Sequence, residues 1–341
     1  MPPLIETRDV SKVYGHGRST TVALDHFSYA IEDGTASITA VAGESGSGKS
    51  TLARLLLGFI KPTSGQVLYR GTDLRALPRR EQAEYRREIQ AIFQDPFAVY
   101  NPFYKVDHLL VTPLRNFGLA KSRSDGRRQI ATALETVGLN PGEILGRYPH
   151  QLSGGQRQRI TIARALLLKP RLIVADEPVS MVDASLRATI LESLLTLKRD
   201  FGISFVYITH DLTTAYQVAD RLIVLYQGGV TEAGAVQPVV RDPQHPYTQL
   251  LIRSIPSTNP DQGWIAEPVS MLDQGDVSSG HGCRFAPRCP HAMPICRTTP
   301  PPLYESNGAA VACYLYQSRP QLPSGDLTKI LTQTETVAAL S

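Results

Sequence analysis

The sequence has neither a long apolar run nor the start of a secretory signal. Its most apolar stretches, such as LIVADEPVSMV, are interrupted by charged side chains before they reach the roughly eighteen apolar residues that a membrane-spanning helix requires. The first residues, MPPLIETRDV, include acidic side chains and no apolar signal core. We therefore expect a cytoplasmic protein that works at a membrane only by docking on other subunits.

A large excess of basic charge is also missing. Lys and Arg number 35 against 31 for Asp and Glu, and the basic residues are scattered along the chain. A nucleic-acid-binding face needs a concentrated basic patch, so we expect no nucleic-acid partner. The content of 42% hydrophobic and 19% charged residues is typical of a globular protein with a substantial core. The length of 341 residues allows one large domain and an appendage.

Cysteine is absent from most of the chain and confined to its C-terminal part. The four cysteines are Cys283, Cys289, Cys296 and Cys313. In a cytosolic chain, such a cluster favours metal ligation over disulfides. Zinc sites more often have two-residue spacers, and four thiolates are also what an iron–sulfur cluster needs. The residues alone leave three possibilities open: an iron–sulfur cluster, zinc or unligated thiols.

A glycine-rich loop, GESGSGKST, follows the predicted strand SITAVAG and precedes the helical pattern LARLLLGFI. In this context, successive backbone N–H groups converge on phosphates at a helix N-terminus. We expect Lys49 to reach the outer phosphates of a nucleotide and Ser50 to ligate Mg²⁺. The predicted ATP-binding loop comprises Gly43, Glu44, Ser45, Gly46, Ser47, Gly48, Lys49, Ser50 and Thr51.

Two acids end the apolar strand RLIVADE. Asp176 is placed to hold Mg²⁺ through water, and Glu177 is placed to polarise an attacking water. Buried strands that end in acidic residues are common in themselves. Here the strand follows a second motif, LSGGQ, by some twenty residues, and this position favours the functional interpretation.

The second motif begins a predicted helix with hydroxyl and backbone donors, which form an anion site. Its residues are Leu152, Ser153, Gly154, Gly155 and Gln156. Together, the two motifs in this order resemble those of the nucleotide-binding subunit of an ATP-binding cassette (ABC) transporter. In that family, the LSGGQ helix faces the ATP held by the other subunit. One chain carries one set of motifs, so the resemblance implies a second ABC ATPase subunit as partner.

The same resemblance assigns roles that residue types alone do not define. His210, at the end of ISFVYITH, matches the switch histidine near the γ-phosphate, although a histidine at a strand end is by itself usually structural. Gln94 matches the glutamine that senses the γ-phosphate and Mg²⁺. Tyr14 matches the aromatic residue under adenine, with a core tyrosine as the alternative. Ser180 and Asp183 match the loop that crosses to the opposite subunit.

Two segments depart from the family pattern. The crossing loop reads SMVD instead of the usual Ser-Ala-Leu-Asp, which leaves subunit communication open without affecting phosphate binding. Residues 95–102 match the loop that contacts a membrane partner, although Val99 and Tyr100 stand where Ser and Leu are typical.

The C-terminal part resembles one branch of the family. HPYTQLLIRSIP and GCRFAPRCPHAMPIC are similar to segments of the oligopeptide/dipeptide importer ATPases, and the resemblance covers about residues 4–320. In that branch the four-cysteine segment is associated with a [4Fe–4S] cluster. The resemblance therefore implies such a cluster here, structural rather than redox-active, with Zn²⁺ as the alternative.

These observations predict an α/β fold. We expect an ABC-type P-loop ATPase domain over residues 1–255, with an antiparallel β subdomain and a helical subdomain at about residues 90–165. A Cys-rich C-terminal extension at 256–320 and a flexible tail at 321–341 would follow.

The resemblance also implies the function. The chain would be the ATP-hydrolysing subunit of an importer of di- and oligopeptides, at the cytoplasmic face of the inner membrane. Its partners would be two transmembrane permease subunits, a homologous second ATPase and, indirectly, an extracytoplasmic solute-binding protein. The alternatives are an importer of the same branch that carries oligosaccharides, nickel or another solute, and a soluble ABC ATPase without a transport role.

Overall fold

The structure is a computed structural model that describes residues 2–15, 20–95, 99–255, 282–322 and 326–332. Three predicted segments lie partly outside the described residues: the C-terminal extension at 256–281, the tail at 333–341 and the membrane-contacting loop at 96–98. Among the described helices, none has the length and apolar character needed to cross a membrane.

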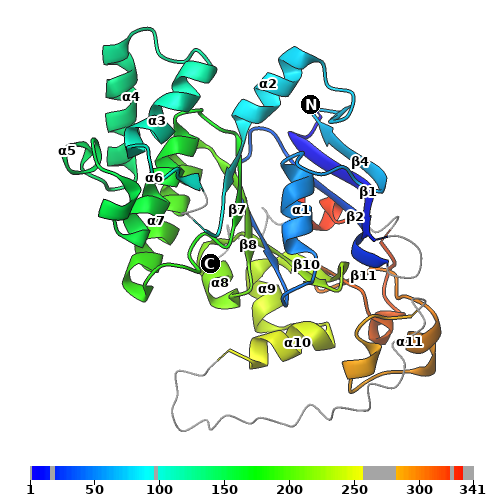
Figure 1. The fold of residues 1–341 in the computed structure, drawn as a ribbon. Coiled ribbons are helices and arrows are strands. Elements are labelled where there is room, and N and C mark those ends of the chain that lie inside the picture. Colours follow the sequence, from blue (N-terminus) through cyan, green and yellow to red (C-terminus); the bar gives the residue numbers. More distant parts are fainter. Residues whose placement is uncertain (1, 16–19, 96–98, 256–281, 323–325, 333–341) are drawn as a thin grey trace, which may run out of the picture.

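An eight-stranded sheet forms the centre of the fold (Figure 1). Its strands, in order across the sheet, are β11 (Tyr304–Ser306), β12 (Ala309–Val311), β10 (Gly229–Ala235), β9 (Arg221–Tyr226), β3 (Ile38–Ala42), β8 (Ser204–Thr209), β7 (Leu172–Asp176) and β6 (Ile89–Ile92). The five strands from β9 to β6 are parallel, and β10, β12 and β11 pair antiparallel. The parallel strands are almost wholly buried apolar runs, as expected for a sheet covered on both faces.

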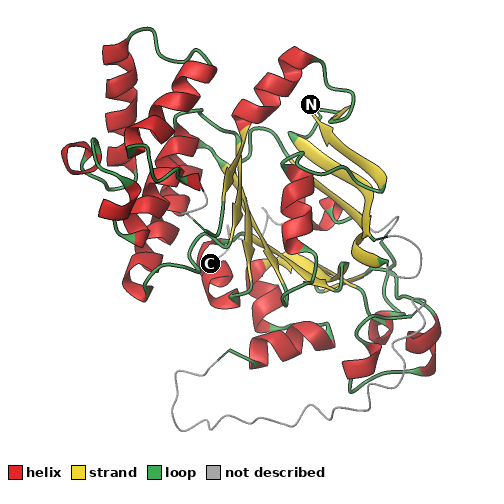
Figure 2. Cartoon of the chain, in the orientation of Figure 1, coloured by secondary structure: helices red, strands yellow, loops and turns green. Residues whose placement is uncertain are grey.

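A second, antiparallel sheet has the order β2–β1–β4–β5. Its strands are β1 (Ile5–Tyr14), β2 (Thr21–Ile31), β4 (Ser64–Tyr69) and β5 (Thr72–Asp73). Figure 2 shows helix α1 (Lys49–Leu56) lying between the two sheets, where its apolar residues, including Leu52 and Leu55, are buried. This sheet occupies the place of the predicted antiparallel subdomain.

The helices between β6 and β7 lie together at one side of the central sheet (Figure 1). They are α3 (Val106–Asn116), α4 (Arg123–Thr136), α5 (Pro141–Ile144) and α6 (Gly154–Leu166), with the short 3₁₀ turn η2 (Pro149–Gln151). Apolar residues of α3, α4 and α6 belong to one core cluster with the central strands. The remaining helices before residue 255 are α2 (Arg79–Glu88), α7 (Ala184–Phe201), α8 (Leu212–Val218), α9 (Val236–Arg241) and α10 (Pro246–Arg253).

The C-terminal segment is built onto the central sheet. The hairpin β11–β12 pairs with β10 in the register Glu232↔Val311 and Ala233↔Ala310. Ala310 and Val311 are fully buried. The segment also contains η3 (Ala286–Arg288), α11 (Pro294–Thr298), η4 (Tyr314–Tyr316) and α12 (Thr328–Thr332). Residues far apart in sequence therefore share one sheet.

The structure departs from the prediction of a flexible tail beginning at residue 321. Leu322, Leu327, Ile330 and Leu331 are buried in a core cluster with residues of β1, β2 and β4. The apolar positions 327, 330 and 331 follow helical spacing, so α12 has one face that gains stability by packing.

Candidate functional site

The parallel strands of the central sheet place the predicted site at one edge. The glycine-rich loop follows β3, Gln94 follows β6, Asp176 and Glu177 end β7, and His210 follows β8. These strands are paired in register, with Ala42 opposite Thr209 and Asp176 opposite Ile208. Because the carboxyl ends of parallel strands share an edge, residues from four distant motifs meet there.

Two glycines let the loop pass close to neighbouring backbone. Gly43 has φ 150°, and a Cβ atom there would lie 2.1 Å from the carbonyl oxygen of Leu225. Gly48 has φ 106°, and its Cβ would lie 2.2 Å from the carbonyl oxygen of Ala23 on β2. Both positions need the absence of a side chain as well as the left-handed conformation. The loop is therefore held in a fixed path between β9 and β2.

Lys49 is buried inside this loop. Its Nζ donates hydrogen bonds to the carbonyl oxygens of Gly43 at 2.7 Å and Glu44 at 2.8 Å, and it lies 3.3 Å from Ser47 Oγ. Burial lowers the pKa of Lys49, while the carboxylates of Glu177, Asp176 and Glu44 act in the opposite direction. A cation in a concave ring of backbone groups at the start of α1 is suited to bind phosphate.

Asp176 lies beside the loop at the end of β7. Burial raises the pKa of its carboxyl group, whereas a hydrogen bond from Ser50 and the charge of Lys49 lower it. A carboxylate and a hydroxyl that already contact each other supply the oxygen donors that Mg²⁺ prefers. Two of the three residues predicted to hold the metal, Ser50 and Asp176, are therefore adjacent.

Glu177 connects the other two predicted catalytic residues. Gln94 Nε2 donates to Glu177 Oε2 at 2.9 Å, and His210 Nδ1 lies 2.8 Å from Glu177 Oε1. Glu177 has φ 47°, an uncommon conformation for a residue other than glycine. Its amide donates to the carbonyl oxygen of Ile208 at 2.9 Å, which holds this backbone against β8. Strained backbone of this kind is frequent at functional sites.

Glu177 and His210 border an open cavity. Its lining includes Glu177, Ser180, Arg187 and His210. The side chain of Glu177 is 18% exposed and that of His210 is 61% exposed. The carboxylate is thus sheltered yet reachable, as required of a base that must meet a water molecule.

The LSGGQ residues form the start of α6. Ser153 is the N-cap: its Oγ accepts a hydrogen bond from the amide of Gln156, and the Gln156 side chain accepts one from the amide of Ser153. Gln156 thus completes a capping box, a role that the motif alone did not reveal. Leu152 is buried, whereas Ser153 is exposed. The N-terminus of α6 therefore presents the Ser153 hydroxyl to solvent, with Gly154 half-buried beside it and Gly155 buried.

The predicted crossing loop lies next to this helix start. A Cβ on Gly154 would be 3.8 Å from the carbonyl oxygen of Met181, and one on Gly155 would be 2.5 Å from Leu186 Cδ1. Ser180 Oγ donates to the carbonyl oxygen of Glu177 at 3.0 Å. The loop thus connects Glu177 to the surface around LSGGQ. Met181, which departs from the family pattern, is exposed.

Tyr14 ends β1 and pairs with Thr21 on β2, two residues from the Ala23 carbonyl that Gly48 approaches. The residue is 39% exposed, and Lys12 Nζ lies 5.2 Å from the centroid of its ring. Tyr14 is therefore a surface aromatic residue near the glycine-rich loop and not part of the core.

Two contacts to the loop were missed by the sequence analysis. Arg288 forms a bidentate ion pair with Glu44, and the hydroxyl of Tyr247 accepts a hydrogen bond from the Glu44 amide at 2.9 Å. Both partners come from the C-terminal part of the chain, and no local pattern links them to residue 44.

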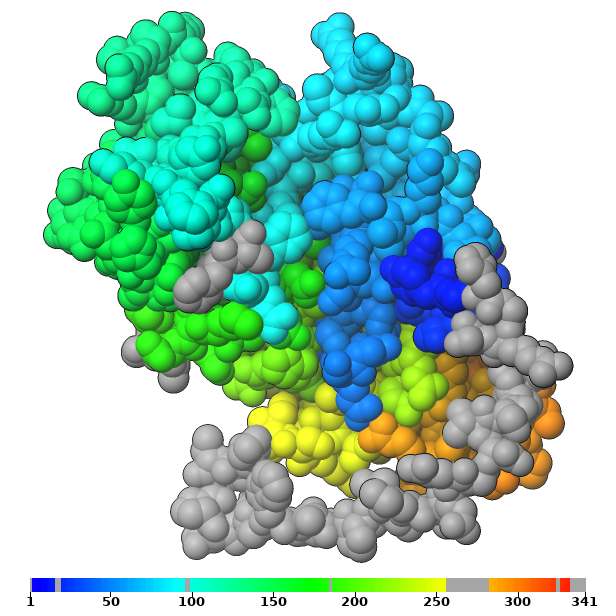
Figure 3. All heavy atoms as spheres, viewed as in Figure 1, coloured from blue at the N-terminus to red at the C-terminus, as the bar shows by residue number. Residues whose placement is uncertain are grey.

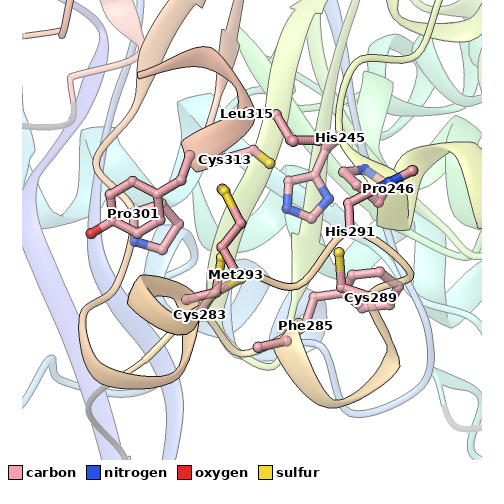
Figure 4. Close-up of a pocket in the computed structure, with 13 residues that line it drawn as sticks. His245, Pro246, Cys283, Phe285, Cys289, His291, Met293, Pro301, Cys313 and Leu315 are labelled. Atoms are coloured by element: carbon pink, nitrogen blue, oxygen red, sulfur yellow. The ribbon is translucent and has the colours of Figure 1, made fainter. Parts of the chain in front are cut away.

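The four cysteines line one cavity together with His245, Phe285 and other residues (Figure 4). Burial raises the pKa of Cys283, Cys289 and Cys313, that of Cys313 to about 11, and the neighbouring cysteines raise it further. Among the described residues, no three His, Cys, Asp or Glu side chains are close enough to hold a single metal ion.

His245 is held by hydrogen bonds at the rim of this cavity. It is buried, and its Nδ1 accepts a hydrogen bond from the amide of Tyr247 at the start of α10. Burial lowers the pKa of His245 to about 4. It is therefore a neutral helix cap whose Nδ1 is occupied within the protein.

Comparison with known families matches two regions of the chain. The profile of the family described as "ABC transporter" matches residues 24–180, and that of "Oligopeptide/dipeptide transporter, C-terminal region" matches residues 231–296. The first range contains the glycine-rich loop, Gln94, LSGGQ and both acids. The second contains α10 and three of the four cysteines.

Individual relatives match over most of their length. The chain is 41% identical over 276 residues to the oligopeptide transport ATP-binding protein OppF of Salmonella typhimurium, covering 80% of this chain and 82% of the relative. It is 40% identical over 320 residues to YkfD of Bacillus subtilis, provisionally named an oligopeptide transport ATP-binding protein, covering 93% and 96%.

Solved structures support the fold. The dimeric ATP-binding cassette MJ0796 in a post-hydrolysis state with ADP and phosphate matches with a TM-score of 0.61 and 29% identity, over 68% of this chain and 98% of that one. The protein cbiO1 of Clostridium perfringens, part of the cbiONQ ABC transporter complex, matches with a TM-score of 0.61 and 25% identity, over 71% and 92%.

Proposed function

Because the chain belongs to the ABC transporter family, in its oligopeptide/dipeptide branch, we propose that it binds and hydrolyses ATP to drive the import of peptides through a membrane permease. The observation that carries the catalytic part is the position of Glu177, whose carboxylate contacts both Gln94 and His210 beside the Lys49 loop. The peptide cargo rests on the names of the relatives.

ATP would be held along the loop that ends at α1. Backbone N–H groups of residues 43–51 and Lys49 would contact the phosphates, while Tyr14 would stack against adenine. Ser50, Asp176 and Gln94 would hold Mg²⁺, and the contact between Ser50 and Asp176 fits this role. The metal would neutralise charge on the outer phosphates.

For hydrolysis, Glu177 acts as the base that orients and polarises the attacking water. His210 holds one carboxylate oxygen and Gln94 holds the other, so both residues position Glu177 as well as facing the γ-phosphate. Preorganised groups of this kind need little rearrangement when charge develops in the transition state.

The exposed start of α6 explains why a second subunit is required. Ser153, Gly154 and Gly155 form the capped N-terminus of α6, and such a terminus favours an anion. We place it, with Ser180 and Asp183, opposite the ATP of a partner cassette. ATP then favours the closed pair because it bridges both subunits only in that state. We propose that the partner is a homologous but non-identical cassette, so that the pair is a heterodimer.

A docking surface for the permease subunits lies near Gln94. Phe93 and Phe103 are exposed, Phe103 to 86%, and the rings of Phe59 and Phe93 stack at the surface with centroids 6.2 Å apart. Exposed aromatic clusters of this kind mark interaction sites. Closure of the cassettes would reach the permease through residues 95–102. We accordingly propose that the chain acts at the cytoplasmic face of the membrane, with a solute-binding protein on the opposite side.

We propose that the chain has the functional units that its motifs predict. Residues 1–255 would form the nucleotide-binding domain and residues 256–320 the cysteine-rich extension. The four cysteines line one cavity, and four thiolates are what a [4Fe–4S] cluster needs. A [4Fe–4S] cluster held there by Cys283, Cys289, Cys296 and Cys313 would crosslink the extension. Anaerobic purification with iron and sulfide analysis tests this assignment; one equivalent of zinc without iron would refute it.

The decisive experiment is the substitution Glu177→Gln. It preserves side-chain size and removes the base, so ATP hydrolysis should be lost while MgATP binding is retained. Normal turnover in this variant would remove Glu177 from its assigned role. Purification of the natural assembly distinguishes the transport function from a soluble ABC ATPase, because only the former co-purifies with hydrophobic permease subunits.

A further inference from the structure

The ion pair between Arg288 and Glu44 joins the cysteine-rich segment to the glycine-rich loop. Arg288 Nη1 donates to Glu44 Oε2 at 2.9 Å, and Nη2 donates to Oε1 at 3.0 Å. This two-point geometry fixes the direction of the carboxylate as well as its distance. Glu44 is the second residue of the loop, and Arg288 immediately precedes Cys289.

The arginine is itself held in place. Its guanidinium lies 5.7 Å from the ring centroids of both Tyr226 and Phe285, and Nη1 donates to the Tyr226 hydroxyl at 3.3 Å. Phe285 is fully buried. On the same segment, Arg284 forms an ion pair of 2.5 Å with Asp25 on β2 and also contacts the carbonyl oxygen of Gln227. Arg288 thus approaches the loop from a rigid support.

A second contact from the C-terminal part reaches the same loop residue. The hydroxyl of Tyr247, on α10, accepts the amide hydrogen of Glu44 at 2.9 Å. The Tyr247 ring packs against Tyr226 and Phe285, with centroids 4.5 Å and 5.5 Å away. Figure 3 shows the surface of the loop region meeting those of α10 and of the segment beyond residue 282. Side chain and backbone of Glu44 are therefore both held from outside the loop.

The charge of Glu44 bears on the phosphate site. Its carboxylate acts electrostatically on Lys49, whose Nζ lies 2.8 Å from the Glu44 carbonyl oxygen. An unpaired carboxylate at this position would repel the triphosphate and compete with it for Lys49. Arg288 removes both effects, because it supplies the opposite charge and directs the carboxylate toward the extension.

We propose that Arg288 and Tyr247 are positioning residues for ATP binding: together they fix Glu44 so that the loop presents its amides and Lys49, and not a free carboxylate, to the phosphates. This proposal rests on the assignment of residues 43–51 as the ATP-binding loop. It gives the C-terminal segment a direct part in nucleotide affinity, in addition to any role of its cysteines.

The test is a double-mutant cycle on the purified full-length chain. MgATP affinity is measured by displacement of a fluorescent ATP analogue at fixed ionic strength. Arg288→Ala should raise the dissociation constant about three- to fivefold, the upper part of the range expected for a half-exposed ion pair, whereas Arg288→Lys should raise it less. In the Glu44→Gln background, the same Arg288→Ala change should cost less than about twofold, because no carboxylate remains to be neutralised.

Arg319→Ala, at an exposed arginine of the same segment, is the matched control and should leave the affinity unchanged. In the ATPase assay, Arg288→Ala should raise the KM for ATP with little change in kcat. If Arg288→Ala lowers MgATP affinity equally in the wild-type and Glu44→Gln backgrounds, its role is purely structural and the proposal is overturned. The proposal is also overturned if the affinity changes in neither background. Lys49→Ala tests the underlying assignment of residues 43–51 as the ATP-binding loop separately from the role of Arg288. If this variant binds MgATP normally, the assignment of the loop itself is wrong.

Discussion

The substitution Glu232→Gln should change how the stability of this protein depends on pH. Glu232 lies on β10 with no exposed surface, and its two carboxylate oxygens accept hydrogen bonds from the amides of Gln244 and His245, both at 2.9 Å. Burial raises its pKa from 4.5 to about 7, and the two amides only partly oppose this shift. In the glutamine variant this titration is absent.

The sign follows from the raised pKa. Between pH 4.5 and 7 the folded protein holds a proton on Glu232 that the unfolded chain has released. The folded state therefore binds more protons than the unfolded state, and the free energy of unfolding falls as pH rises through this window. One pKa unit corresponds to about 1.4 kcal/mol. From pH 5 to pH 8 the contribution of Glu232 should fall by about 2.5 kcal/mol.

The measurement is urea unfolding of wild type and variant at a series of pH values in the same buffer system. All other groups titrate in the same way in both proteins. The pH dependence of the difference in unfolding free energy therefore reports the titration of Glu232. Glutamine has one acceptor oxygen, and one amide loses a partner, which lowers variant stability by about 1–3 kcal/mol independently of pH. A difference that stays constant from pH 5 to pH 8 would refute the assigned pKa and the burial argument behind it.

Three further substitutions test separate parts of the structure. Gly48→Ala should abolish MgATP binding, because the added Cβ would lie 2.2 Å from the Ala23 carbonyl oxygen. An equilibrium binding measurement tests this, and wild-type affinity in the variant would contradict the loop geometry. Ser153→Ala removes the N-cap of α6 and should destabilise that helix by about 1 kcal/mol, with a larger loss of ATPase activity in the assembled transporter than of ATP binding by the single chain. Leu327→Ala should lower the unfolding free energy by about 2–4 kcal/mol, since Leu327 is fully buried; an unchanged melting temperature would show that α12 contributes nothing.

The meeting of the candidate site residues at one edge of the central sheet could be predicted because each part has a local signature. The loop with Lys49, the acids at the end of β7 and His210 after β8 are each recognisable within a few residues, and a parallel sheet brings strand ends to one edge. What the motifs could not give is the contact of Glu177 with both Gln94 and His210, because its geometry depends on backbone at φ 47°.

The C-terminal region was harder to predict because its signals are weak or distant. The spacing of Leu327, Ile330 and Leu331 indicates a short amphipathic helix, but a single turn within a polar tail gains its stability only from the sheet on which it packs. The pair Arg288–Glu44 spans 244 positions in sequence. Neither residue type is unusual where it stands, so only the folded chain reveals the contact.

These C-terminal contacts form a continuous path from the cysteine cavity to the phosphate loop. Strand β12, two residues before Cys313, pairs with β10, whose Glu232 fixes the amides that lead into α10. Helix α10 then carries Tyr247 to the Glu44 amide, while Arg288 reaches the Glu44 carboxylate directly.

Truncation of the chain at residue 255 would therefore also disturb the part that remains. It would expose the edge of β10 and remove the cation that pairs with Glu44. An unpaired strand edge is prone to association with other chains. The boundary predicted at residue 255 thus separates two residues that both contact Glu44 of the glycine-rich loop, Tyr247 before it and Arg288 after it.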